Sequence, residues 1–176
     1  MPLTGPGEFT IADARPEVGV ASAVRYSVEV ERGLPFDDDR VAREVDATLA
    51  DGRGWAARLG IRVQRVAAAP ALRILVATPG TTDALCAPLD TAGRVSCRNG
   101  ALVVINAVRW AEAVPWYAGD VGGYRTYVVN HEVGHYLGRP HRSCPGPGLP
   151  APVMQQQTKG LGGCLPSMWP SADEIE

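Results

Sequence analysis

The histidines constrain the fold of this chain more than any other feature. All 3 histidines fall within residues 131–141, whose sequence is HEVGHYLGRPH. His131 and His135 are four residues apart, so on a helix they lie one turn above each other on one face. Gly138 can take the left-handed conformation that ends a helix, and the turn would bring His141 back beside them. The spacing predicts a helix, a break and one metal site with three nitrogen ligands.

Glu132 lies between the two helical histidines. It is turned about a hundred degrees from His131 around the helix, so its carboxylate would reach a water on the metal and act as a general base. Three ligands leave a fourth position open, which is typical of catalytic zinc. The absence of a ligating carboxylate argues against a two-histidine iron site, while nickel, cobalt and copper stay possible occupants. The alternative is an accidental motif whose histidines are ordinary surface groups.

The motif HExxHxxGxxH, followed by a methionine in a tight turn, resembles the signature of the metzincin clan of zinc endopeptidases. Met154 in the segment PVMQ is the candidate methionine, and its alternative role is that of a gap-filling core residue. The resemblance implies an apolar floor beneath the histidines, one catalytic Zn²⁺ and a peptide or protein substrate. The wider chain, with NHEVGHYLGRPH and paired cysteines, also resembles an actinobacterial family of secreted or membrane-anchored proteins of unknown function.

The chain departs from the clan at the oxyanion site. Several metzincins have a tyrosine two residues after the methionine, where this sequence has Gln156. Arg142, Gln155 or Gln156 could supply a donor instead, or zinc could act largely alone. Aromatic candidates for lining the cleft, each also a candidate for the core, are Trp116, Tyr117 and Trp169.

Hydrophobic patterning predicts an α+β fold. Strands are expected at residues 24–31, 61–66, 72–78 and 102–106, and helices after the acids at 37–39 and after Asp120. The acids suit a helix start, and a calcium site is their alternative role. The order resembles a metzincin: a twisted, mostly parallel sheet of four to five strands, a backing helix, a zinc-site helix and a small irregular C-terminal subdomain. Residues 94–97 are either an edge strand that binds a peptide substrate or a surface loop.

The whole chain, residues 1–176, is expected to form a single domain. Within it we expect a flexible segment at 1–20, an N-terminal subdomain at 21–138 and a C-terminal subdomain at 139–176. Residues 2–10 are polar and rich in Gly and Pro, unlike a signal peptide, so a signal or anchor would lie outside this sequence.

The 4 cysteines are an even number, which favours disulfides. Pairing of nearest neighbours, one of three possible arrangements, joins Cys86 to Cys97 and Cys144 to Cys164. The simplest account is an extracellular or cell-envelope protein. Free thiols in a reducing compartment are the alternative.

Composition restricts the partners. A net charge of -2 without a basic stripe argues against nucleic acid, and no apolar run reaches the roughly 20 residues needed to span a bilayer. We expect a monomer. Two other functions stay open: a catalytically inactive zinc-binding or interaction domain of the cell envelope, and a zinc amidase acting on a non-protein amide of the cell wall.

Overall fold

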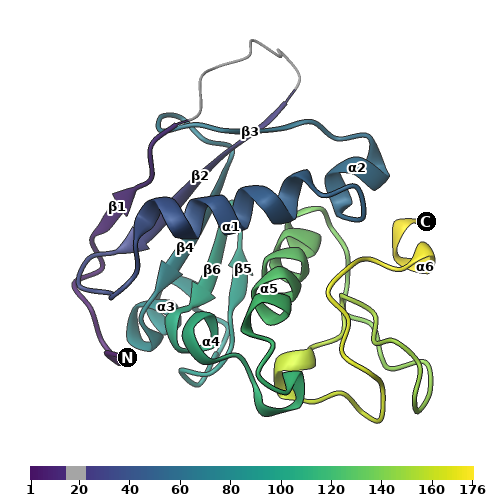
Figure 1. The fold of residues 1–176 in the computed structure, drawn as a ribbon. Helices are drawn as coiled ribbons and strands as arrows, with labels where there is room; N and C mark the ends of the chain where they lie inside the picture. Colours follow the sequence, from purple (N-terminus) through teal and green to yellow (C-terminus); the bar gives the residue numbers. More distant parts are fainter. Residues whose placement is uncertain (15–22) are drawn as a thin grey trace.

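The computed structural model describes residues 1–14 and 23–176, and Figure 1 shows a central sheet flanked by helices. Within these residues, six strands form the sheet in the order β1-β2-β4-β6-β5, and β3 pairs with β2. Strands β2, β3, β4 and β6 run parallel, whereas the two outer strands β1 and β5 are antiparallel to their neighbours. The bounds are β1 (Phe9–Ile11), β2 (Val24–Glu31), β3 (Val63–Arg65), β4 (Leu72–Ala77), β5 (Cys97–Asn99) and β6 (Leu102–Asn106).

Alternating side chains give the sheet two buried faces, as strand β6 illustrates. Val103 and Ile105 belong to the large core, whereas Leu102 and Val104 face a smaller cluster with Cys86 and Cys97. Because both faces are covered there, β4 and β6 are largely apolar, as is usual for parallel strands, whereas β2 alternates apolar and polar residues.

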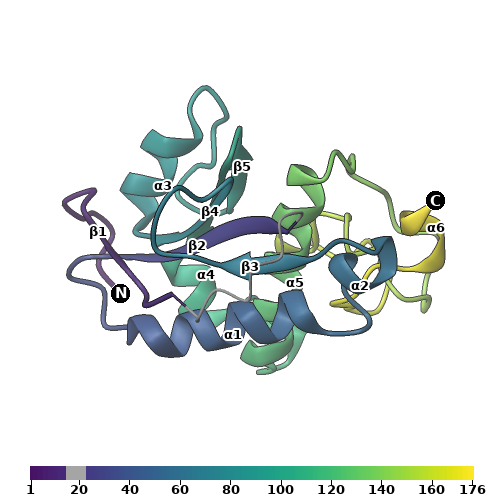
Figure 2. The same cartoon turned by 90° about the horizontal axis from the view of Figure 1, so that it is seen from above.

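Two long helices, α1 (Asp38–Ala50) and α5 (Val121–Tyr136), pack into the large core together with the shorter α4 (Ala107–Glu112). Viewed from above, α1 lies along one side of the sheet and α3 (Pro79–Cys86) lies on the other (Figure 2). The remaining helices are α2 (Trp55–Leu59) and α6 (Ala172–Ile175), with 3-10 turns η1 (Pro115–Tyr117) and η2 (Gln157–Lys159). In the described part of the chain, no helix has the length and apolar character required to cross a membrane.

After Gly138 the chain is mostly irregular and lies against the outer side of α5, in green and yellow in Figure 1. Disulfides join Cys86 to Cys97 and Cys144 to Cys164, as predicted. The second disulfide closes a loop that contains Met154. Two disulfides are consistent with an oxidising, extracellular environment.

The mixed α+β class, the helix after the 37–39 acids and the strand at 24–31 agree with the sequence analysis. The strand count does not, because six strands were found in the described residues and four to five were predicted. The additional strand is β1, which lies inside the segment 1–20 that was expected to be flexible and pairs with β2. Residues 15–20 of that segment lie outside the described residues.

The predicted edge strand at 94–97 is displaced, since β5 starts at Cys97. The backbone N–H groups of Arg94 and Val95 both donate to the carbonyl of Thr91, so this part of the segment is a turn.

Candidate metal centre

Helix α5 carries two of the three histidines and is itself held by local capping. Asp120 accepts a hydrogen bond from the N–H of Gly123 (2.7 Å), which satisfies one free donor at the helix start. Tyr124 and Tyr127 pack against Tyr117 in an aromatic cluster, and the Tyr127 ring lies 5.5 Å from the His131 ring, centroid to centroid. The cluster fixes the rotation of the helix that points His131 towards the site.

The end of α5 is a Schellman motif centred on Gly138. The N–H of Gly138 donates to the carbonyl of His135 (3.1 Å), and the N–H of Arg139 donates to that of Gly134 (2.9 Å). Gly138 has φ 82°, in the left-handed region that glycine adopts at low cost. This geometry confirms the predicted break and turns the chain back towards the helix with His141.

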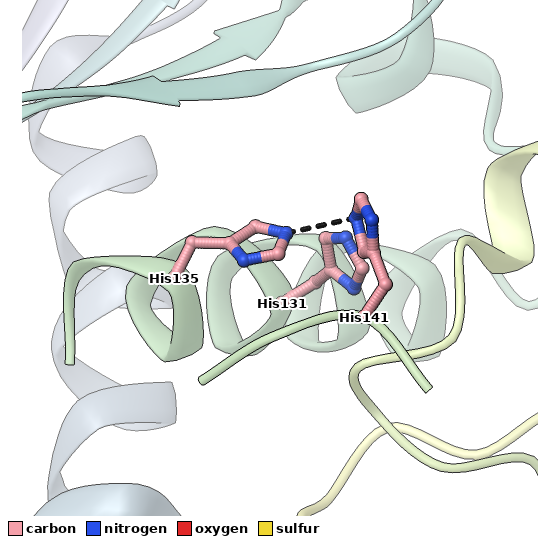
Figure 3. A group of neighbouring side chains, drawn as sticks. All are labelled: His131, His135 and His141. Atoms are coloured by element: carbon pink, nitrogen blue, oxygen red, sulfur yellow. Dashed lines mark hydrogen bonds between the residues drawn. The ribbon is translucent and has the colours of Figure 1, made fainter. Parts of the chain in front are cut away.

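The three imidazole rings point towards one another from α5 and the segment after it (Figure 3). One nitrogen of each ring lies within 4.8 Å of the others, and Nε2 of His135 is 2.9 Å from Nε2 of His141. His131 Nδ1 bonds the carbonyl of Val153 (2.8 Å), and His135 Nδ1 bonds that of Arg139 (2.9 Å). These bonds leave both Nε2 atoms free for a metal and fix the ring orientations. Three such nitrogens fit a borderline-soft divalent cation such as zinc.

Burial keeps the histidines neutral and the nearby glutamate protonated when no cation is close. It lowers the pKa of His131 to about 3, helped by repulsion from His135 and His141, and it also lowers the pKa of those two residues. Burial raises the pKa of Glu132 to about 8. Neutral imidazoles are the form that binds metals, and a cation beside Glu132 would favour the ionised carboxylate that a base requires.

Met154 forms the floor under the helix. Its side chain is 1% exposed and lies against Gly134, which is between the two helical histidines in the sequence. It belongs to the 152–155 turn, closed by a hydrogen bond from the N–H of Gln155 to the carbonyl of Pro152 (3.0 Å). The same turn supplies the Val153 carbonyl that orients His131, so Met154 and His131 are held by one short segment.

A pocket of about 380 Å³ opens over the histidines and Glu132. Its lining includes residues 95–98, which contain the start of β5, and also Gln156 and Lys159. Arg98 spans from β5 to α5 and donates two hydrogen bonds to the carbonyl of His135 (3.0 and 3.2 Å). The edge strand and the helix that carries His131 and His135 are therefore joined directly beside the site.

Of the three predicted oxyanion candidates, Gln156 lines the pocket, whereas Arg142 and Gln155 are not among its lining residues. The Gln155 amide donates to the carbonyls of Gly160 and Leu161, and the Arg142 guanidinium donates to the carbonyl of Asp173. The three aromatic candidates also fall outside the pocket lining. Tyr117 is in the core, and Trp169 lies under Arg53 at 4.3 Å.

Sequence reasoning missed Arg98 and Lys159 at the pocket, and it missed Gln157 behind it. Gln157 is fully buried; its amide nitrogen donates to the carbonyls of Pro152 and Ser167, and its side-chain oxygen accepts from Tyr117 (2.8 Å). A signal existed only for Lys159, which is the single lysine in the sequence.

Replacing Gly134 by alanine tests the close packing of the floor. The new methyl group would overlap Met154 Sδ and lie 3.1 Å from Cζ2 of the buried Trp55, so we expect a loss of about 1–3 kcal/mol in unfolding free energy. Gly122→Ala, in the same helix, is the matched control because the nearest atom would be 3.7 Å away; it should be neutral or stabilise by up to about 1 kcal/mol. Denaturant unfolding of both variants measures this, and equal stabilities would contradict the packing argument.

Comparison with known proteins identifies a family but no activity. Residues 1–164 match a family described as "Protein of unknown function (DUF3152)". No curated protein and no solved structure matched the chain. The matched residues include Glu132, the three histidines and both disulfides, and they span far more than half of the 176 residues. On this match, the chain belongs to the DUF3152 family.

Proposed function

We propose that this protein is a zinc-dependent endopeptidase in which Glu132 is the general base. The observation that carries the proposal is the convergence of three histidine nitrogens, two of them oriented by backbone carbonyls, in a pocket that also contains the buried carboxyl of Glu132. A structural site would more often fill the fourth position with another protein ligand. The three-histidine set with an adjacent base supports catalysis instead.

Zinc bound at His131, His135 and His141 would lower the pKa of a water and polarise a substrate carbonyl. Glu132 accepts the proton from the attacking water and delivers it to the amine nitrogen as the peptide C–N bond breaks. Gln156 is the predicted donor that lines the pocket, and its amide is our candidate for stabilising the developing negative charge on the carbonyl oxygen.

The β5 edge supports an extended peptide as the substrate. β5 lies at an edge of the sheet and pairs only with β6 among the described strands. Its first residue, Cys97, lines the pocket. An extended chain laid beside this edge would gain backbone hydrogen bonds and bring a peptide bond over the histidines. The buried Met154 beneath α5 supports the resemblance to the methionine turn of metzincins. We further propose that the protein is extracellular or in the cell envelope and acts as a monomer.

The function is tested by incubating the zinc-loaded protein with a broad peptide library and, separately, with cell-wall fragments. Parallel reactions contain Glu132→Ala or a chelator. We expect cleavage of internal peptide bonds that is lost in both controls. Release of amines from cell-wall fragments alone would replace the peptidase by an amidase with the same ligands and base. Tight zinc binding without hydrolysis of either substrate would identify an inactive zinc-binding domain.

Lys159 is expected to favour acidic substrates. Its side chain is exposed and lines the pocket. Its positive charge helps to lower the pKa of His141. Within the described ranges 1–14 and 23–176 it makes no ion pair. Asp90 and the buried Glu132 are the acids that line the same pocket. For paired peptides that differ by Glu or Gln near the scissile bond, Lys159→Gln should raise KM for the Glu peptide by about fivefold, as for a partly exposed ion pair. Lys159→Arg should preserve the preference. An identical Glu-to-Gln ratio of KM in all three proteins would contradict it.

A further inference from the structure

Helix α6 contacts the 152–155 turn beneath the histidines through the side chain of Glu174. Glu174 is 1% exposed although it is only two residues from Glu176. Its two carboxylate oxygens accept hydrogen bonds from the N–H groups of Met154 (2.7 Å) and Val153 (3.0 Å). Ser171 donates to the same carboxylate through its N–H and its hydroxyl, and the N–H bond is part of a capping box between Ser171 and Glu174 at the start of α6.

The turn that Glu174 holds also contacts His131 and the residue after His141. The Val153 carbonyl is the group that binds His131 Nδ1 (2.8 Å), and the Met154 carbonyl accepts the N–H of Arg142 (3.1 Å), the residue after His141. Glu174 thus fixes the N–H side of a turn whose carbonyls orient the first ligand and hold the backbone beside the third.

Helix α6 also accepts hydrogen bonds from arginines on both sides of His141 in the sequence. The guanidinium of Arg142 donates to the carbonyl of Asp173 (2.6 Å), and that of Arg139 donates to the carbonyl of Ile175 (3.0 Å). His141 itself is exposed, and it follows the helix break on an irregular segment. These two bonds are therefore important restraints on its position.

We propose that Glu174 is a positioning residue for the metal centre, and that α6 orients His131 and His141 for zinc. The inference rests on zinc binding by the three histidines, as in the proposed function, but not on peptidase activity. Partners that orient a ligand from outside the coordination sphere commonly affect metal affinity by about 10- to 100-fold. Glu174 should do so because the Met154 N–H that it binds is in the same peptide group as the Val153 carbonyl that orients His131, and because the Met154 carbonyl holds the backbone next to His141.

The test is the zinc dissociation constant of Glu174→Gln, measured by competition with a chromogenic chelator. A glutamine has the same shape, but its NH₂ group would face at least one of the three backbone N–H donors of Val153, Met154 and Ser171, which leaves that donor unpaired. We expect zinc affinity to fall about 10- to 100-fold and the visible spectrum of the cobalt-loaded protein to change with the coordination geometry. The matched control is Asp173→Asn, which removes the same charge one residue away; only its backbone carbonyl takes part in the contacts described above, so both readouts should stay near those of the parent.

The outcomes distinguish failure of the proposed metal site from failure of the positioning role of Glu174. If the parent does not bind zinc, the metal site of the proposed function fails. If the parent binds zinc and a folded Glu174→Gln variant binds it equally well with an unchanged cobalt spectrum, the positioning role is overturned. Should Glu174→Gln fail to fold, the exposed Arg142→Gln variant tests the same clamp on the His141 side. Its zinc affinity should also fall, and an unchanged affinity would overturn the proposal.

Discussion

Replacing Glu132 by glutamine is expected to reduce peptide hydrolysis by roughly a thousandfold while zinc stays bound. The variant preserves the size of a side chain that is 4% exposed, so packing around α5 should change little. The amide has no basic group to accept the proton of the attacking water, and the three histidines remain intact. The measurements are kcat and KM on a peptide found in the library screen, together with the zinc content of the purified protein.

The matched control for this variant is Glu112→Gln. It makes the same chemical change at an exposed residue of α4 and should leave kcat unchanged. A Glu132→Gln protein that holds one zinc per chain and cleaves peptides as fast as the parent would refute the role of Glu132. Loss of zinc together with loss of activity would instead show that the carboxyl supports the metal site.

Removal of the Cys144–Cys164 disulfide is expected to have the largest effect on stability. This disulfide closes a loop of sequence separation 20 that contains the 152–155 turn. Opening such a loop restores chain entropy to the unfolded state and costs roughly 3 kcal/mol. The Cys144→Ser/Cys164→Ser protein should therefore unfold at a lower temperature. It should also bind zinc more weakly, because the loop carries the carbonyl that orients His131.

The other disulfide provides a matched comparison. Cys86–Cys97 has a sequence separation of 11 and anchors the first residue of β5, not the turn beneath the histidines. Because its loop is shorter, its removal should cost a somewhat smaller free energy, and it should act mainly on KM, because the proposed wall for an extended substrate is loosened. If the two double variants lose zinc affinity equally, the special role assigned to the 144–164 loop is wrong.

Local sequence signals were sufficient for the elements that carry the three histidines. The 3.6-residue period, the Asp120 cap and the left-handed Gly138 depend on neighbouring residues, so α5 and its end could be predicted. The strand Val24–Glu31 was also predicted with its correct bounds because its residues alternate and have high β propensity. The disulfide pairing followed from sequence proximity.

What the sequence could not reveal depends on contacts between distant segments. Glu174 lies 20 residues from Met154 in the chain, and Gln157 reaches Tyr117 across 40 residues. An acid near a helix start and a glutamine in a run of three are ordinary in sequence, since their importance comes from buried partners supplied by the fold. The position of β5 was missed for a similar reason: its pairing with β6 begins only where the turn closed by Thr91 ends.

The short β5 edge has a further consequence for solubility. A strand edge that is open to an extended peptide is also open to the edge of a second molecule, and such pairing leads to aggregation. β5 has three residues, and its last two, Arg98 and Asn99, are exposed and polar. So short and polar an edge offers few backbone bonds to a neighbouring sheet, while a flexible peptide can gain additional contacts with the pocket. On the proposed function, the brevity of β5 would limit self-association at the edge of the sheet that binds the substrate.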